Sequence, residues 1–409
     1  MTPDSGADPD AIPRGAITCL ALAAFGSAMS LRVNDALLPK LATEFGISLG
    51  TAAQVISVFA IAYGFAQLFF GPVGDRFGKY RVIAWATLAC AATALACAAA
   101  PDFDTLRIAR ALAGATAAAV IPLSMAWLGD VVAYEHRQPV LARFLIGQIV
   151  GLSAGVWLGG LAADQLSWRA PYLFLAALFV AVSVALFAFN RRLPPHARAM
   201  KRASGPVLRR VAAEFAGVFS LPWARVILGL VFLEGMCLYG PFAFIASHLH
   251  QAFGLTLSAA GAVVMLFGVG GFVFAIMSHR LVANLGEPGL IRWGGAFMCI
   301  ALLMVGYAPA WGWALAGCLL LGLGYYMLHN TLQVNATQMA PDRRGAAVSA
   351  FASSFYLGQS VGVSLGGLWV GVFGTGSFLA VGAIGVLGVA IAFGVLRTRH
   401  RLALATVAS

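Results

Sequence analysis

Long apolar runs, separated by short polar segments, make up most of the chain. A helix needs about 20 apolar residues to cross a bilayer, and runs near this length recur from end to end. They predict twelve spans at residues 15–39, 50–72, 82–100, 104–131, 138–162, 170–190, 222–247, 257–281, 289–308, 310–338, 344–371 and 377–396. The pattern therefore predicts an all-α integral membrane protein with twelve transmembrane helices.

The longest polar segment between spans, 191–221, divides the twelve spans into two six-helix halves. It is rich in arginine and lysine, as a cytoplasmic connection would be. The predicted layout is a cytoplasmic N-terminal tail (1–14), an N-terminal half (15–190), a basic cytoplasmic central loop (191–221), a C-terminal half (222–396) and a cytoplasmic C-terminal tail (397–409).

Composition agrees with a membrane protein. Hydrophobic residues make up 61% of the 409 residues and charged residues only 10%, against about 25% charged in soluble proteins. The formal net charge is +11. Most basic residues lie in one set of short loops and at the termini, while the opposite loops hold little beyond Lys40 and Arg169. We therefore expect a multi-pass protein of the inner or plasma membrane, surrounded by lipid, with both termini cytoplasmic and no nucleic-acid partner.

The sequence offers little for catalysis or metal binding. All six cysteines lie inside apolar segments, without a CxxC or Cys/His spacing. No nucleophile–base constellation and no GxxxxGK[ST] motif occurs. We expect no disulfide, no metal, no cofactor, no enzymatic activity and no ATP-driven transport. The short acidic N-terminus does not resemble a cleaved signal peptide.

Charge is concentrated in one turn between predicted spans 2 and 3, which reads GPVGDRFGKYR from Gly71 to Arg81. It resembles the G-x-x-x-D-R-x-G-R-[KR] signature of the major facilitator superfamily. The resemblance extends over essentially the whole chain and implies a monomer with two halves that rock by alternating access. The equivalent turn of the second half, 278–287, lacks the Asp-Arg pair.

The resemblance also implies a conformational latch. Its residues are Gly71, Gly74, Asp75, Arg76, Gly78, Lys79 and Arg81. In the family, the aspartate lies against the N-terminal end of span 11, where free N–H groups and the helix dipole favour an anion. The alternative is that the basic residues only mark topology, but this leaves Asp75 and the glycines unexplained.

Two further stretches resemble elements of proton-coupled members. Residues 106–114 in span 4 resemble an R-x-x-x-G element, with Arg110 as its arginine. Residues 151–160 in span 5 are similar to the antiporter signature G-x-x-x-G-P-x-x-G-G, but Val156 replaces the proline. The glycines of span 5 have an alternative role as a packing face.

Ionisable side chains inside spans are costly and are therefore functional candidates. Arg32 and Asp35 are three residues apart and share a helix face. We expect Asp35 to bind a proton or a cationic substrate, with Arg110, or else Arg107, as its partner. Glu234, in the middle of span 7, is the third proton-coupling candidate. The alternatives are a structural ion pair for Asp35 and a structural hydrogen bond for Glu234.

Polar and aromatic residues in the spans complete the predicted substrate site. His329 and Gln333 share a face of span 10, where His329 either titrates near neutral pH or forms a buried hydrogen bond. The substrate-binding candidates are Arg32, Asn34, Asp35, Tyr63, Gln148, Trp157, Glu234, Tyr239, Phe242, Tyr326, His329, Asn330, Gln333, Tyr356 and Gln359.

These features favour proton-coupled export of small amphipathic compounds, of the multidrug type, about a central site. The alternative on the same fold is a proton-coupled or facilitative importer of a small organic anion, sugar or metal complex, in which Arg32 and Arg110 clamp an anion. A sensor or assembly factor is disfavoured, because no cytoplasmic segment is long enough to signal. The substrate itself stays open.

Overall fold

Helices and short turns account for the described chain. The computed structural model describes residues 13–132, 134–198 and 207–408, and no strand occurs in these ranges. The predicted tail 1–14 and the middle of the predicted central loop fall largely outside the described residues. The α-helices are α1 (Arg14–Arg32), α2 (Leu38–Phe45), α3 (Leu49–Ala52), α4 (Gln54–Phe77), α5 (Lys79–Ala98), α6 (Phe103–Ala117), α7 (Val120–Val131), α8 (Tyr134–Gln165), α9 (Ala170–Arg192), α10 (Val207–Phe219), α11 (Pro222–Glu234), α12 (Gly240–Phe242), α13 (Ile245–Phe253), α14 (Leu257–Tyr307), α15 (Trp313–Gln338) and α16 (Arg344–Ala408). Three further short helices are the 3₁₀-helices η1 (Pro195–Arg198) and η3 (Pro341–Arg343) and the π-helix η2 (Gly235–Tyr239).

The twelve-helix prediction is confirmed once two long helices are divided at their breaks. Ten helical stretches in the described residues are long and apolar enough to cross a membrane. Two of them greatly exceed the roughly 20 residues that one crossing needs. α14 turns at Gly286 (φ 61°), and α16 turns at Gly374 (φ 80°). Both glycines have a positive φ that disfavours any side chain, so each turns the chain back and makes two crossings.

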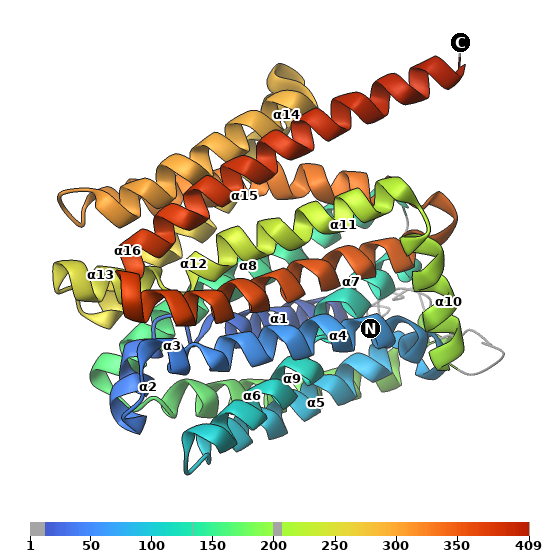
Figure 1. The fold of residues 1–409 in the computed structure, drawn as a ribbon. Coiled ribbons are helices and arrows are strands. Elements are labelled where there is room, and N and C mark those ends of the chain that lie inside the picture. Colours follow the sequence, from blue (N-terminus) through green and yellow to red (C-terminus); the bar gives the residue numbers. More distant parts are fainter. Residues whose placement is uncertain (1–12, 133, 199–206, 409) are drawn as a thin grey trace, which may run out of the picture.

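The two halves each have their own core. In Figure 1 the N-terminal half lies mainly below the C-terminal half. In the first half α1 packs on α8 and α9, and α4 packs on α6. In the second half α14 packs on α15, and α11 packs on α16. The two large hydrophobic clusters follow this division, since one draws mainly on residues before 200 and the other mainly on residues after 215.

The two ends of the bundle are distinguishable by their elements. We call the end with α10, the turn at Gly78 and the break at Gly286 the basic end. We call the end with α3 and the break at Gly374 the opposite end. Figure 1 shows α10 on the right and α2 and α3 on the left.

Two of the spans are interrupted near the centre of the bundle. Span 1 leaves the helix after Arg32 and resumes at Leu38, with Pro39 in the first turn of α2. Span 7 changes from α-helix to the π-helix η2 after Glu234, and Pro241 follows in α12. A proline lacks the N–H that continues a helix, and π-helical turns are frequent at functional sites. Such breaks in a membrane helix are expected where the backbone lines a site instead of facing lipid.

The halves meet along one seam between spans 2 and 11. A Cβ on Gly50 would overlap the carbonyl group of Gly367. Ser360 Oγ donates to the carbonyl of Ser57 at 2.9 Å, and Ser353 Oγ donates to the carbonyl of Gly64. The three contacts recur every seven residues on both helices, the spacing of a coiled-coil seam.

This seam stops before it reaches the basic end. The next position in the same spacing is Gly71, and a Cβ there would meet nothing within 4 Å. Gly345, at the start of span 11, is equally open. Spans 2 and 11 are therefore in close contact from the opposite end to the middle of the bundle and separate toward the basic end.

A second seam joins spans 5 and 8. Cβ atoms on Gly160 and Gly268 would overlap Leu257 and Ser153, respectively. Where this seam reaches the opposite end of the bundle, Asp164 of span 5 caps the first turn of α14. Leu257 N–H donates to Oδ1 at 3.2 Å, and Ser258 N–H donates to Oδ2 at 2.7 Å. The first N–H groups of a helix have no partner within the helix, so a carboxylate of one half here completes a helix of the other.

Candidate functional site

The first charged pair of the site comes from the break in span 1. Arg32 Nη1 lies 3.4 Å from Asp35 Oδ2, and both side chains are almost fully buried. The guanidinium of Arg32 also lies 3.8 Å from the ring centroid of Tyr239 and 5.0 Å from that of Phe242, both in span 7. A buried cation over aromatic faces is attracted by the negative face of each ring. The pair therefore sits where the two halves meet.

Arg110 is fully buried beside this break but does not hydrogen-bond Asp35. Its Nη2 donates to the carbonyl of Ser30 at 3.0 Å, and its Nε donates to the carbonyl of Val55 at 3.3 Å. In the amide orientation that satisfies both neighbours, Asn34 accepts from Arg110 Nη2 at 3.1 Å and donates to Tyr172 Oη at 2.5 Å. Arg110 thus holds the interrupted backbone of span 1 and positions Asp35 indirectly.

Arg107, the alternative partner, lies away from Asp35. It donates to Gln54 at 2.9 Å and pairs with Asp104 at 3.0 Å. These contacts belong to the opposite end of the N-terminal half.

The second pair of ionisable residues lies in the C-terminal half. Glu234 is fully buried at the end of α11, and its Oε2 lies 2.8 Å from Nδ1 of His329 on α15. The His329 ring stacks on Tyr325, with 4.8 Å between centroids. The π-helix that follows Glu234 offsets the register of span 7, so that Glu234 faces α15 while Tyr239 faces Arg32.

Aromatic rings connect the two pairs. Tyr239 contacts Phe242, Phe267, Tyr325 and Phe355. Tyr63 of span 2 and Tyr356 of span 11 join the halves, with 4.4 Å between ring centroids. We call the rings of Tyr63, Tyr239, Phe242, Phe267, Tyr325, Tyr326, Phe355 and Tyr356 the aromatic cluster.

Several buried polar atoms of spans 1, 2, 7 and 11 have no hydrogen-bond partner among the described residues. They are Asp35 Oδ1, Glu234 Oε1, Ser57 Oγ, Gln67 Nε2 and both polar atoms of the Gln359 side chain. Buried polar groups in proteins are almost always paired, so each exception needs an explanation. A polar ligand that moves through the protein is one explanation, because it requires groups that no permanent partner occupies.

The structure gathers most of the predicted substrate residues, but not all. Trp157 is 38% exposed and makes no described ring contact with the aromatic cluster. Gln148, Asn330 and Gln333 are half-buried, with no side-chain hydrogen bond among the described residues. Phe267, Phe355 and Ser57 join the site without having been predicted. Phe267 and Phe355 carry no charge, so nothing in the sequence separates them from the packing aromatics of other spans.

The charged turn 71–81 makes its contacts within its own half. Lys79 lies 3.4 Å from Asp75 and forms a second ion pair with Asp130. Gly78 has φ 88°, which a side chain would disfavour. No hydrogen bond or ion pair joins Asp75 to α16 among the described residues. The predicted contact with span 11 is therefore not engaged in this conformation, in which the basic end of that seam is open.

The glycines of span 5 form a packing face against span 1. A Cβ on Gly147 or Gly155 would lie 2.6 Å or 2.7 Å, respectively, from a carbonyl oxygen of α1. Gly151 and Gly159 meet the next carbonyls of the same row. Glycine every fourth residue lets two membrane helices approach to backbone contact. These glycines therefore hold span 1 in place next to its break.

Comparisons with known proteins establish the class. The family model described as Major Facilitator Superfamily matches residues 20–362. The chain belongs to this family, whose fold and members are those of membrane transporters. A solved structure of the human organic anion transporter MFSD10 (TETRAN) has the same fold, with a TM-score of 0.70, 16% identity and coverage of 93% of this chain and 99% of that chain.

Two sequence relatives are similar over much of the chain. An uncharacterized MFS-type transporter, YceJ of Bacillus subtilis (strain 168), is 25% identical over 81% of this chain and 83% of its own length. The puromycin resistance protein pur8 of Streptomyces alboniger is 29% identical over 67% of this chain and 50% of its own length. The protein is thus a multi-pass membrane transporter of a small-molecule substrate.

Proposed function

We propose that this transporter exports small amphipathic compounds in exchange for protons, as a multidrug-type antiporter. One observation carries the proposal. Asp35 and Glu234 are buried carboxylates in opposite halves, at the two sides of the aromatic cluster, and each has one oxygen without a described partner. The similarity to pur8, a puromycin resistance protein, supports export of drug-like compounds.

The chemistry of the pair supports exchange. A buried carboxylate is costly unless it is protonated or paired with a cation. Asp35 is paired with Arg32 in this conformation. A proton on Asp35 would weaken that pair, while a cationic substrate would favour the ionised form. Proton and cation therefore compete for one group, which is the requirement for antiport.

The aromatic cluster supplies the apolar part of the proposed site. Tyr239, Phe242 and Phe355 come from the C-terminal half, and Tyr63 comes from the N-terminal half. Aromatic faces bind both apolar and cationic groups. A site shared by both halves would change shape when the halves rock about the two seams, as alternating access requires.

The orientation of the protein is part of the proposal. Basic residues favour the cytoplasmic side, and α10 and the turn at Gly78 lie at the basic end. We place the basic end and both termini in the cytoplasm and the protein in the inner or plasma membrane as a monomer. The separation of spans 2 and 11 at that end would then correspond to a cytoplasm-facing conformation.

Everted membrane vesicles with an imposed pH gradient test the proposal. Addition of cationic drugs to vesicles with the native protein is expected to release protons, seen as fluorescence dequenching. Asp35→Asn should abolish this signal, because an amide neither binds a proton nor pairs with a cation. Asp104→Asn, which alters an exposed carboxylate at the opposite end, is the control. Equal signals in the native and Asp35→Asn proteins would contradict the proposal.

Glu234→Gln tests the second carboxylate. Glutamine keeps a hydrogen-bond acceptor for His329 but removes the charge. We expect a changed proton-to-substrate ratio or a narrower range of transported cations at an unchanged melting temperature. Unchanged transport across a panel of cations would assign Glu234 a structural role.

One observation favours the alternative, import of a small organic anion. Arg32 has a single carboxylate contact, and its guanidinium faces the aromatic cluster, where its remaining donors could bind an anion. Uptake of labelled organic acids by right-side-out vesicles, lost in Arg32→Gln, would favour this function over drug export. Absence of any uptake would exclude it for the acids tested.

A further inference from the structure

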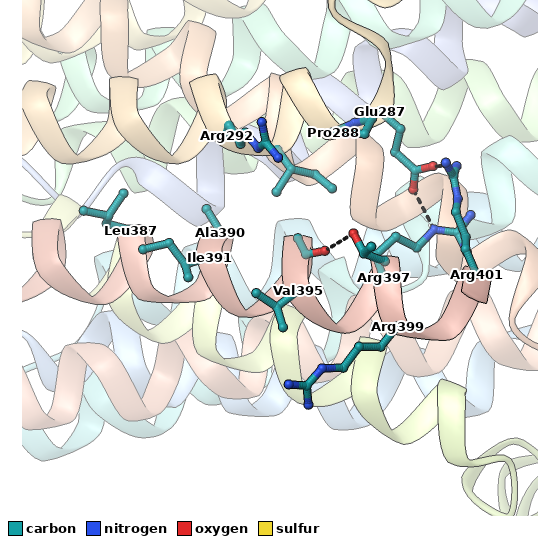
Figure 2. Close-up of a pocket in the computed structure, with 13 residues that line it drawn as sticks. Glu287, Pro288, Arg292, Leu387, Ala390, Ile391, Val395, Arg397, Arg399 and Arg401 are labelled. Atoms are coloured by element: carbon teal, nitrogen blue, oxygen red, sulfur yellow. Dashed lines mark hydrogen bonds and ion pairs between the residues drawn. The ribbon is translucent and has the colours of Figure 1, made fainter. Parts of the chain in front are cut away.

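A pocket on the outer surface of the C-terminal half combines arginines with an apolar wall. It lies between the part of α14 that follows Gly286 and the last part of α16, and has a volume of about 560 Å³. This volume is within the ~300–1,000 Å³ typical of small-ligand sites. Figure 2 shows Arg292 from α14, and Arg397, Arg399 and Arg401 from α16. The pocket is distant from the aromatic cluster and takes no part in the transport mechanism proposed above.

The charge of the pocket is strongly positive. Four arginines and one acidic residue, Glu287, line it. Glu287 accepts from Arg397 at 2.9 Å, from Asn335 at 2.9 Å and from Arg401. No ion pair to Arg292 or Arg399 occurs among the described residues. Two exposed guanidinium groups therefore remain without a fixed counter-charge.

The framework around these arginines is held in place. Glu287 ties the end of α16 to the turn of α14, as Figure 2 shows. His400 stacks on Trp223 at the start of α11, with 4.1 Å between ring centroids and 4° between the rings. The arginines of α16 consequently project from a fixed helix end rather than from a loose tail.

The apolar side of the pocket runs along α16 toward the middle of the membrane. Leu387, Ile391 and Val395 follow one another along this helix in Figure 2. Ile391 is 59% exposed and Val395 is 46% exposed, so both present apolar surface outside the bundle. From Leu387 to Arg397 a helix rises roughly 15 Å, which is half of the ~30 Å hydrocarbon core.

We propose that this pocket binds an anionic phospholipid of the surrounding leaflet. The phosphate would lie beside Arg292, on the side of α16 that faces α14, and an acyl chain would follow Leu387, Ile391 and Val395, while Arg399 would add positive charge on the far side of α16. Basic pockets between membrane helices favour anionic headgroups. A soluble phosphate would satisfy the arginines but would leave the apolar wall uncovered, so the wall favours a lipid over a free anion.

The test is native mass spectrometry of the full-length protein released from nanodiscs of phosphatidylcholine mixed with phosphatidylglycerol. We expect one retained phosphatidylglycerol per chain and little retained phosphatidylcholine. In the double variant Arg292→Gln/Arg399→Gln, the fraction of protein that retains this lipid should fall at least about tenfold. The matched control Arg191→Gln/Arg192→Gln removes the same charge from exposed arginines at the end of α9 and should retain it like the native protein.

Two results would overturn the proposal. Equal retention by the native protein and the Arg292→Gln/Arg399→Gln variant would show that the lipid binds elsewhere. Displacement of the lipid by inorganic phosphate, at concentrations comparable to those of added phosphatidylglycerol, would show a free-anion site without lipid specificity. Circular dichroism and gel filtration of both double variants verify folding, which exposed Arg→Gln changes are expected to preserve.

Discussion

The two ends of the interface between the halves differ, although similar chemistry is present at both. At the opposite end Asp164 of span 5 caps the first turn of α14, across the two halves. Near the basic end Asp75 pairs with Lys79 inside its own half. Each aspartate is suited to the N-terminus of a helix in the other half, but only Asp164 is engaged.

The glycines repeat the same difference. Gly50 is in backbone contact with Gly367, whereas Gly71, three heptads along span 2, is open. At the opposite end the helices of the two halves are in close contact and the aspartate caps a helix of the other half. At the basic end the helices are apart and the aspartate pairs within its own half. This difference leads us to expect that the ends exchange roles in the other conformation, with Asp75 engaged and Asp164 released.

The largest expected effect comes from filling the closed seam. In Gly50→Ala, the new methyl group would overlap the carbonyl of Gly367, and such overpacking costs about 1–3 kcal/mol. The opposite end should no longer close, and transport should fall at least tenfold. Gly371→Ala, four residues after Gly367 on α16 and with nothing within 4 Å of the added methyl group, is the control and should transport normally. Loss of activity in both variants would contradict the role of close approach.

Removal of the Asp164 charge should have a smaller effect. Asp164→Asn keeps an acceptor for the first turn of α14 but removes the charge beside it, which is worth about 0.3–1 kcal/mol. This loss shifts the balance of conformations by up to about fivefold toward opening of the opposite end. Distances between spin labels on Phe77→Cys and Gly345→Cys, in a background without the native cysteines, would shorten as the basic end closes. Unchanged distances would exclude Asp164 from gating.

Asp102 provides the matched control, because it caps a helix within one half. Its Oδ1 accepts from the Thr105 N–H at 2.8 Å. This backbone hydrogen bond lowers the pKa of the Asp102 carboxyl below its ordinary value. Its contribution to stability is therefore present above the unfolded pKa and is lost as pH falls through the folded pKa. Asp102→Asn should remove this local contribution and leave the spin-label distances unchanged.

The smallest shift is expected for Asp75→Asn, and in the opposite direction. Lys79 keeps its ion pair with Asp130 when Asp75 loses its charge, so the present conformation should lose little. The conformation in which Asp75 would cap span 11 should lose more, by ~0.3–1 kcal/mol. The spin-label distances should therefore lengthen or stay long, and transport should slow. Asp130→Asn, which also removes a partner of Lys79, should not shift them.

The sequence predicted the membrane class and the twelve helices, because each crossing leaves an apolar run that can be counted. It did not predict that spans 1 and 7 would be interrupted. Asn34, Asp35 and Pro39 mark the first break, and Gly240 with Pro241 accompanies the second. Neither set of residues by itself distinguishes a break from a kink or a tolerated irregularity.

The sequence predicted most of the residues of the candidate site but not which of them contact one another. Arg32 and Asp35 are close in sequence, so helical spacing alone placed them on one face. Glu234 and His329 lie on different spans, and only the packing of α11 on α15 brings them to 2.8 Å. Likewise, Arg110 was expected beside Asp35, but its guanidinium donates to the carbonyl of Ser30 in span 1 and to that of Val55 in span 2.

By itself, the sequence determined which segments enter the membrane, where charge is concentrated and which few ionisable groups are buried. An unpaired polar group is costly in the hydrocarbon core of the bilayer, so the segments that enter it must be almost entirely apolar, and this pattern can be seen in the sequence. Only the tertiary structure decided which partners those groups meet, that the glycines of span 5 pack on span 1, and which end of the interface is closed. Those outcomes depend on contacts between helices that are far apart in the chain. Many apolar helix faces could pack on one another, and the geometry of the folded backbone determines which of them are in contact.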